Sequence, residues 1–209
     1  MGDFFNKSLR DVINACASGA PTPGGGSVSA IVACFGVAMT AMVCNLTVGK
    51  EKYMDVEPQV KGILEKSQTL LEGLEKLVDA DMMVFNNFMD TYRLPRSTGE
   101  EKKAREAAMQ KALKNATDTP VEIARVCLEA LQINEEIASL GNKMAISDAG
   151  VAAVVIEAAL KSVLLNVDIN IPMIKDQGYM QKILAEKEKI MLEAGKLKER
   201  SVAVVRERM

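Results

Sequence analysis

An uncharged run from Ser27 to Gly49 constrains this chain more than any other feature of its sequence. The run follows two prolines and three consecutive glycines, which favour a loop, and Ser27 is a good N-cap residue for a helix. A helix that is apolar on every side either lies at the centre of a bundle or spans a membrane. We therefore predict a loop up to Gly26 and a central helix from Ser27 to about Gly49.

The composition of this helix favours the core of a bundle over a membrane span. The run contains polar side chains, lacks a tryptophan or basic cluster that would anchor it in a bilayer, and is not joined by a second span. It also begins too late in the chain for a signal peptide. One face carries small residues that would let another helix approach closely, namely Ser27, Ala30, Cys34, Ala38, Ala41 and Asn45.

The overall composition predicts an all-α fold without a membrane or nucleic-acid partner. Aromatic residues make up only 4% of the 209 residues, whereas residues with high helix propensity are plentiful, and the length suits one domain over residues 1–209. A net charge of −2 excludes a broad nucleic-acid-binding surface. The four cysteines are scattered and form no C-x-x-C pair, which is typical of reduced thiols in the cytoplasm.

Histidine is absent from the sequence. This absence excludes serine triads with a histidine base, zinc sites with histidine ligands and catalysis by imidazole. If the protein is an enzyme, its proton transfers fall to carboxylates, lysines, tyrosines or thiols.

Apolar periodicity predicts five further helices, over about residues 7–17, 58–92, 98–137, 148–170 and 179–206. Thr98 and Glu101 form a capping box at the start of the third of these helices. Pro120 predicts a kink or a fresh start within it. The last helix places apolar residues at seven-residue intervals, so it packs along a bundle or against a second subunit.

An acidic residue shares a helical face with aromatic residues in the segment from Asp81 to Tyr92. Asp81, Phe85, Phe88 and Tyr92 are spaced by four, three and four residues. Burying a carboxylate among apolar groups costs free energy unless the group is paired or protonated. Asp81 therefore either reaches solvent or caps a neighbouring helix, or it is a functional acid with a raised pKa.

Three other features allow both a functional and a purely structural interpretation. The glycines before the central helix expose backbone N–H groups that can face an anion, although the segment lacks the lysine of a P-loop and is otherwise a flexible turn. Asp148, in the first turn of its helix, is either a functional acid or a residue that favours the helix dipole. Arg93 and Arg96 lie at a helix break and are either ligands for carboxylates or solvated charges.

The order of four segments resembles one known family. These segments are PTPGGGSVSA with MVCNLTVGKEKY, then VDADMMVFNNFMDTYRLPR, SLGNKMAISDAGVAA and LLNVDIN, and together they cover most of residues 15 to 172. The chain thereby resembles the formimidoyltetrahydrofolate cyclodeaminase and methenyltetrahydrofolate cyclohydrolase family. The resemblance implies an up-and-down bundle of long antiparallel helices that dimerises and acts on folate one-carbon units.

The resemblance also implies roles for particular residues. Asp81 and Asp148 are the candidate catalytic carboxylates, with Lys103 or Tyr92 as proton donors, and which aspartate is the base stays open. The candidate substrate-binding residues are Pro23, Gly24, Gly25, Gly26, Ser27, Asn45, Arg93, Arg96, Asn142, Asn166 and Asn170. No metal or redox cofactor is implied, and the expected ligand is a tetrahydrofolate derivative.

Two activities of this family remain open, together with a third, non-catalytic role. One activity hydrolyses 5,10-methenyltetrahydrofolate to 10-formyltetrahydrofolate, and the other closes 5-formiminotetrahydrofolate to the methenyl form and releases ammonia. We expect the first, because the chain carries no attached formiminotransferase domain. A helical-bundle adaptor would explain the periodicity, but it would not explain the polar residues at three helix breaks.

Overall fold

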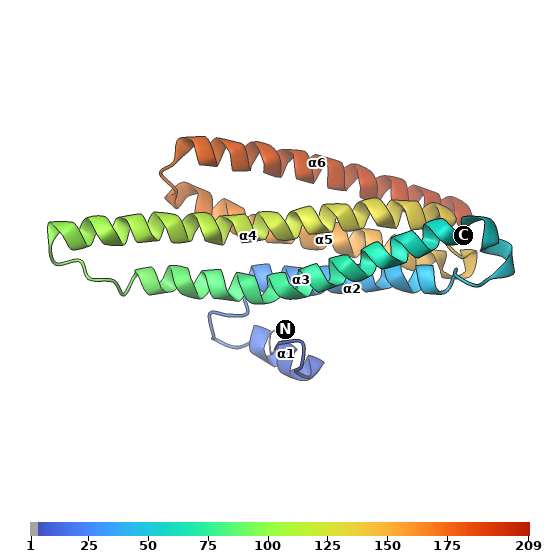
Figure 1. Ribbon diagram of the computed structural model, residues 1–209, viewed down its shortest axis with the longest axis horizontal. Coiled ribbons are helices and arrows are strands. Elements are labelled where there is room, and N and C mark those ends of the chain that lie inside the picture. Colours follow the sequence, from blue (N-terminus) through green and yellow to red (C-terminus); the bar gives the residue numbers. More distant parts are fainter. Residues whose placement is uncertain (1–3) are drawn as a thin grey trace.

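Four long helices pack side by side in the computed structural model of the protein, which describes residues 4–209 (Figure 1). They are α2 (Gly25–Asn45), α3 (Glu57–Thr91), α4 (Gly99–Leu140) and α5 (Ile146–Asn170). A fifth long helix, α6 (Gln177–Arg208), packs on α4 and α5. The remaining elements are α1 (Leu9–Cys16) and three short 3-10 helices, η1 (Glu51–Val56), η2 (Lys143–Ala145) and η3 (Ile171–Met173).

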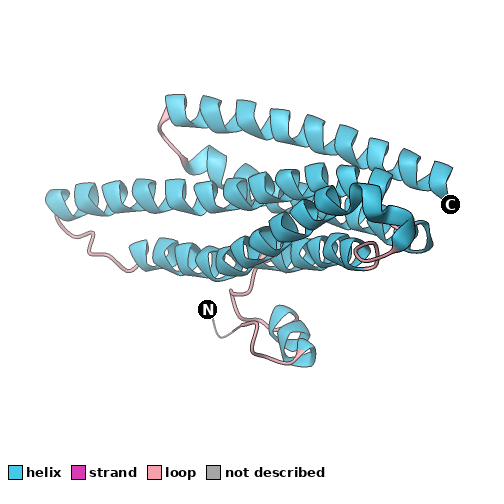
Figure 2. Ribbon diagram, turned by 45° about the vertical axis from the view of Figure 1, so that its right-hand side comes forward, coloured by secondary structure: helices cyan, strands magenta, loops and turns pink. Residues whose placement is uncertain are grey.

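Consecutive long helices run in opposite directions and lie next to one another. α2 packs on α3 and α5, and α4 packs on α3 and α5, so the four form a square bundle with α6 along one side. Figure 2 shows that helices account for the regular structure of residues 4–209 and that α1 lies apart from the bundle at the end of a loop. The prediction of an all-α, up-and-down bundle of long antiparallel helices is confirmed.

The central helix of the sequence, α2, packs in the core through one face, whereas Phe35 and Met42 on its other face are exposed, so the prediction of burial on every side was wrong. Ala30, Ala33 and Val37 are fully buried. Gly36 lets α2 and α5 approach closely, because a Cβ atom at this position would lie 2.4 Å from Cγ1 of Ile156. The small side chains of α2 therefore serve helix packing.

A second helix also has the length and hydropathy of a membrane span, so the prediction that no second such segment accompanies Ser27–Gly49 was wrong, although it was one of the arguments for a core helix. The two candidates are Gly25–Asn45 and Lys143–Met173, and 61% and 50% of their apolar windows are buried inside the bundle. Such burial is typical of core helices in soluble proteins.

Several predicted helix limits differ from the structure, and α2 ends at Asn45 and not near Gly49. α2 begins at Gly25 with Gly24 as its N-cap, two residues before the predicted start, because the hydroxyl of Ser27 donates to a side chain on α3 instead of capping its own helix. α4 continues through Pro120 without a fresh start. Proline cannot donate to the carbonyl of residue 116, and this carbonyl of Ala116 accepts a hydrogen bond from Nδ2 of Asn170 at 3.0 Å.

The predicted capping box at the start of α4 is confirmed. The Thr98 hydroxyl accepts from the Glu101 N–H at 3.1 Å, and the Glu101 carboxylate accepts from the Thr98 N–H at 3.0 Å. We expect Thr98→Ala to lower the free energy of unfolding by about 0.5–2 kcal/mol, because one N–H of the first turn loses its acceptor. Urea unfolding followed by circular dichroism measures this change.

Ser97→Ala is the matched control for this substitution. The backbone N–H of Ser97 donates to Glu101, but its hydroxyl makes no hydrogen bond within residues 4–209. An equal loss of stability in both variants would contradict the role of the capping box.

Candidate functional site

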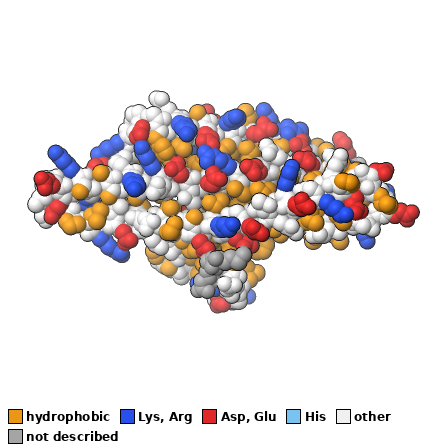
Figure 3. Space-filling model, viewed as in Figure 1, with side chains coloured by type: hydrophobic (Ala, Val, Ile, Leu, Met, Phe, Trp, Pro, Cys, Tyr) orange, Lys and Arg blue, Asp and Glu red, His pale blue; other side chains and the backbone are white. Residues whose placement is uncertain are grey.

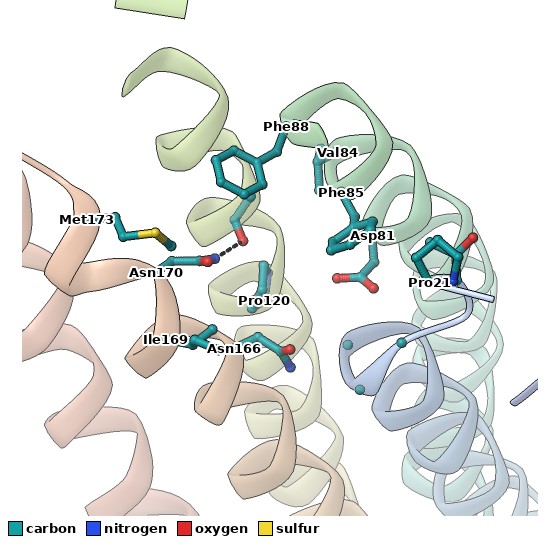
Figure 4. A pocket seen from close by; sticks show the side chains of 15 residues that line it. Pro21, Asp81, Val84, Phe85, Phe88, Pro120, Asn166, Ile169, Asn170 and Met173 are labelled. Carbon is teal, nitrogen blue, oxygen red and sulfur yellow. Dashed lines mark hydrogen bonds between the residues drawn. The ribbon is translucent and has the colours of Figure 1, made fainter. Parts of the chain in front are cut away.

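A cavity of about 280 Å³ opens at the end of the bundle where α2 begins (Figure 4). Residues from the loop before α2, from α2 itself and from α3, α4, α5 and η3 line it, so the cavity depends on the packing of the whole bundle. Its lining residues are Pro21, Thr22, Gly24, Gly25, Gly26, Asp81, Val84, Phe85, Phe88, Ala116, Pro120, Asn166, Ile169, Asn170 and Met173.

Asp81 is the one ionisable residue among these lining residues. Its carboxylate lies against the first turn of α2, where Oδ2 accepts a hydrogen bond from the Ser27 hydroxyl at 2.7 Å. Gly26 makes this approach possible, because a Cβ atom there would lie 2.2 Å from Oδ1 of Asp81. Gly26, the last glycine of the run, therefore allows a carboxylate to pack against the first turn of a helix.

Opposing effects act on the protonation of Asp81. Burial among apolar side chains raises its pKa, and hydrogen bonds from the hydroxyl and backbone N–H of Ser27 lower it. Burial prevails, so the pKa lies above the ordinary value of 3.8. The positive end of the α2 dipole favours the ionised form as well. A carboxylate in this state is a stronger base than one in water and attracts a cation strongly.

The remaining walls are largely apolar, with two amides on α5. Asn170 donates to the Ala116 carbonyl that Pro120 leaves free, a bond drawn in Figure 4, and so joins α5 to α4. Asn166 lies beside Gly25 and donates to the Val163 carbonyl at 3.2 Å. This combination of flat apolar walls, two amides and one carboxylate suits a flat heterocycle that carries positive charge.

The structure brings seven of the predicted site residues together at this cavity. Six are lining residues, and the seventh, Ser27, holds Asp81 from within the first turn of α2. Pro23 precedes α2 and is half-buried, but its neighbours Pro21 and Thr22 line the cavity in its place. The six lining residues are Gly24, Gly25, Gly26, Asp81, Asn166 and Asn170.

Four predicted residues lie along the hairpin formed by α3 and α4. Tyr92 is eleven residues beyond Asp81, or about 16 Å along a helix, and is half exposed. Arg93 forms an ion pair with Asp90 at 2.7 Å, whereas Arg96 and Lys103 are exposed. Arg105, which was not predicted, donates to the Thr91 carbonyl and lies 5.6 Å from the Tyr92 ring, so it joins the two helices.

Three predicted residues, Asn45, Asn142 and Asp148, lie at the opposite end of the bundle. Asp148 precedes Asn166 by eighteen residues of α5, or about 27 Å. Asn142 donates through Nδ2 to the Leu46 carbonyl at 2.8 Å, and Asn45 is exposed at the end of α2. One chain therefore does not supply both aspartates to one cavity.

Several lining residues were absent from the predicted site. Phe85 and Phe88 share the helical face of Asp81, so their spacing was a usable signal. Ala116 and Pro120 on α4 have no such signal, because only the packing of α4 against α3 and α5 brings them to the cavity.

The described residues show no metal-binding cluster, and the face seen in Figure 3 carries charges of both signs. Within residues 4–209, no three acidic or cysteine side chains lie close enough together to hold a metal ion. Figure 3 shows acidic and basic side chains interspersed over the visible face.

Sequence comparison shows that this chain is similar to enzymes of folate metabolism. The family model of formiminotransferase-cyclodeaminase matches residues 8–189. A methenyltetrahydrofolate cyclohydrolase from Methylorubrum extorquens is 43% identical over 204 residues, which are 98% of each chain. Formimidoyltransferase-cyclodeaminase from Mus musculus is 30% identical over 86% of this chain, and this chain spans only 33% of that longer protein.

A solved structure shares the whole fold. Formiminotetrahydrofolate cyclodeaminase from Thermotoga maritima superposes with a TM-score of 0.88 at 30% sequence identity, over 97% of this chain and 98% of that one. Both a cyclohydrolase and a cyclodeaminase are thus similar to this chain over nearly its full length.

Proposed function

Since this chain belongs to the formiminotransferase-cyclodeaminase family, we propose that it is a folate one-carbon enzyme that hydrolyses 5,10-methenyltetrahydrofolate to 10-formyltetrahydrofolate. The observation that supports this activity best is the carboxylate of Asp81, held against the start of α2 in an apolar cavity. The 43% identity to a cyclohydrolase over 98% of both chains favours hydrolysis over ring closure.

The proposed chemistry needs one carboxylate next to a cationic bridge. The methenyl carbon shares a positive charge with two folate nitrogens, and ionised Asp81 stabilises this charge in a site with little water. A water molecule attacks the bridge carbon, and Asp81 accepts a proton from it as the C–O bond forms. The hydroxyl on the bridge carbon then loses its remaining proton and N5 gains one, so that the C–N5 bond breaks as the C=O bond forms and the formyl group stays on N10.

Proton transfer by a carboxylate draws on no metal or redox cofactor. Phe85 and Phe88 offer apolar surface for the ring system, and Asn166 and Asn170 offer amides for its polar edge. The glutamate tail would follow the α3–α4 hairpin towards Arg96 and Lys103, which are exposed, whereas Arg93 is already paired with Asp90.

A cyclodeaminase is the second candidate, because the cyclodeaminase from Thermotoga maritima shares the fold over nearly the whole chain. In that reaction N10 attacks the formimino carbon and gives its proton to Asp81, which would pass a proton to the nitrogen that departs as ammonia. The two activities differ in their products and not in the kind of site that they need.

Two assays on the purified protein separate these candidates. We expect enzyme-dependent loss of the methenyl absorbance with 5,10-methenyltetrahydrofolate and no ammonia from 5-formiminotetrahydrofolate. Formation of the methenyl form with stoichiometric ammonia would make the protein a cyclodeaminase. If neither assay showed turnover, the result would contradict an enzymatic role and favour an adaptor.

The hydrogen bond from Ser27 predicts a shift in the pH profile. In Ser27→Ala the hydroxyl that lowers the pKa of Asp81 is lost, so this pKa rises further. Because the ionised form is the base, the acidic limb of kcat/KM should move to higher pH than in the wild type. A pH–rate profile measures this shift.

Ser29→Ala is the control for this prediction. The Ser29 hydroxyl donates to the Gly25 carbonyl at 2.7 Å within α2 and has no hydrogen bond to Asp81. The acidic limb of the kcat/KM profile of Ser29→Ala should lie at the same pH as in the wild type. A shift equal to that of Ser27→Ala would contradict the proposed contact between Ser27 and Asp81.

The proposed enzyme works as a cytoplasmic homodimer. Three of the four cysteines are buried as free thiols, which suits a reducing compartment. Exposed apolar side chains on α2 and α5, including Phe35 and Leu165, favour self-association.

A further inference from the structure

The backbone of α4 brings to the cavity a carbonyl that its own helix cannot satisfy. In an α-helix the N–H of each residue donates to the carbonyl four positions earlier, but Pro120 has no N–H. The carbonyl of Ala116 therefore lacks its usual donor, and Ala116 and Pro120 both line the cavity. A carbonyl left without a donor beside apolar side chains costs free energy, so this group needs a donor from another element.

Asn170 of α5 supplies this donor. Its Nδ2 donates to the Ala116 carbonyl at 3.0 Å, a bond that Figure 4 shows. A carbonyl oxygen can only accept, so the nitrogen of the amide must face α4. The reverse orientation would bring Oδ1 against the carbonyl oxygen and leave both oxygens without a donor. Pro120 therefore determines which way round the Asn170 amide lies.

The oxygen of this amide is left for the cavity. Oδ1 of Asn170 makes no hydrogen bond within residues 4–209, and the residue is partly exposed where it lines the cavity. Asn166 lies one turn earlier on the same face of α5. Its Nδ2 donates to the Val163 carbonyl at 3.2 Å, and its Oδ1 also has no donor in this part of the chain. The α5 wall thus presents two amide oxygens, and both are hydrogen-bond acceptors.

The carboxylate of Asp81 lies across the cavity from Asn170. Asp81 is on α3, and α3 and α5 occupy diagonal corners of the square bundle, because α2 and α4 each pack on both of them. Figure 4 shows the Asp81 carboxylate beside the start of α2 and Asn170 on the far wall. A ligand that reaches from one to the other places its reacting carbon at Asp81 and its remote edge at Asn170.

The remote edge of a tetrahydrofolate carries N–H donors. Its pyrimidine ring holds the N3–H and the 2-amino group on the side away from the N5–N10 bridge, and both groups donate hydrogen bonds. A site whose acceptors meet such donors rejects an analogue that lacks them, because its acceptors are then left unpaired. An amide that could turn over would receive a donor or an acceptor equally well, so its orientation decides whether the site discriminates.

We propose that Pro120 is a positioning residue for substrate recognition, because it leaves the Ala116 carbonyl free and so holds Asn170 with Oδ1 towards the N3–H and 2-amino edge of the substrate. This role rests on the proposed function and adds to it the edge of the heterocycle that the cavity reads. Asn170 is the residue that contacts the substrate, and Pro120 acts through it.

A substrate analogue without the 2-amino group tests this recognition. For the wild type, kcat/KM with 5,10-methenyltetrahydrofolate should exceed kcat/KM with its 2-desamino analogue by at least about 10-fold, because Oδ1 of Asn170 loses a donor. In Asn170→Ala the acceptor is absent, so this discrimination should largely disappear. The loss of activity on the natural substrate should then appear as a higher KM with little change in kcat.

Pro120→Ala separates a positioning role from a merely structural one. Alanine restores an N–H donor to the Ala116 carbonyl, so the Asn170 amide is released and can turn over. Because proline destabilises a helix interior, the Tm of this variant should be at least as high as that of the wild type. Its discrimination against the 2-desamino analogue should nevertheless fall by about 3- to 10-fold. Loss of the proline ring as an apolar contact would weaken both compounds alike and leave the discrimination unchanged.

The double variant shows whether Pro120 acts through Asn170. If it does, Pro120→Ala should not change the discrimination further once Asn170→Ala is present, whereas independent effects would add. Pro58→Ala is the matched control, because Pro58 lies in the first turn of α3 and outside the lining of the cavity, and this variant should match the wild type. Additive effects, or unchanged discrimination in Pro120→Ala, would overturn the role of Pro120.

The wild type separates failure of this role from failure of the proposed function. Hydrolysis of substrate and analogue with equal kcat/KM would overturn recognition by Asn170 and leave the proposed function intact. Isothermal titration calorimetry gives the same comparison as a ratio of Kd values, so the role of Pro120 is testable without turnover. A wild type that neither hydrolyses nor binds 5,10-methenyltetrahydrofolate would overturn the proposed function, and the role of Pro120 with it.

Discussion

Replacing Asp81 by asparagine is expected to lower kcat for methenyltetrahydrofolate hydrolysis by about 10²–10⁴-fold. Asparagine keeps the size of the side chain and can still accept the Ser27 hydroxyl bond, so the cavity should keep its shape. It cannot accept a proton or balance the charge of the cationic bridge. Steady-state kinetics on the methenyl absorbance measures the loss.

The same substitution should stabilise the fold at neutral pH. Folding raises the pKa of Asp81, so burial of the ionised carboxylate costs free energy at any pH above that raised pKa. Below the ordinary value of 3.8 the group is protonated in both states, and the cost is gone. The Tm of Asp81→Asn should exceed that of the wild type at neutral pH, and the difference should shrink towards about pH 4.

Asp79→Asn is the control for both measurements. Asp79 lies on the same helix but is not among the residues that line the cavity. Its kcat should stay close to that of the wild type. Equal losses in the two variants, or unchanged activity in Asp81→Asn, would contradict the role of Asp81 as the base.

Replacing Gly26 by alanine is expected to lower kcat by about 10²-fold, although the added group is a single methyl. Its Cβ atom would lie 2.2 Å from Oδ1 and 2.6 Å from Cγ of Asp81, closer than real contacts allow. The carboxylate must move away from α2 and lose the Ser27 hydrogen bond. Overpacking of this kind should also lower the free energy of unfolding by about 1–3 kcal/mol.

Gly73→Ala separates this contact from the general effect of alanine in a helix. Gly73 lies within α3, and a Cβ atom there would meet no atom within 4 Å. Alanine favours helix over glycine by about 0.5–1 kcal/mol, so this variant should be more stable and fully active. Full activity in Gly26→Ala would show that Asp81 does not depend on its position against α2.

Local patterns in the sequence were enough to predict most helices and several of their ends. The capping box of Thr98 and Glu101 begins α4 as predicted, and Pro58 lies in the first turn of α3. These features depend on residues within one or two turns, so their physical causes are present in a short segment. The helical face of Asp81, Phe85 and Phe88 was visible for the same reason.

The resemblance to a family selected particular segments of the chain, but it did not predict how they are arranged in space. It selected the glycines before α2 and Asp81 on α3, which the structure brings into contact. It also selected Asp148, which the structure places at the other end of α5 from the cavity. Shared motifs identify segments of the chain, and they carry no distances between them.

The sequence alone determined an all-α fold, the place of α2 among the core helices and a chemistry without histidine, because periodicity and composition are properties of the chain itself. Only the tertiary structure decided which faces meet. The contact of Asp81 with Gly26 joins residues that are 55 positions apart. The hydrogen bond from Asn170 to the Ala116 carbonyl, which Pro120 leaves without a donor, joins residues that are 54 positions apart. Contacts of this range depend on how helices pack against one another, which no local pattern encodes.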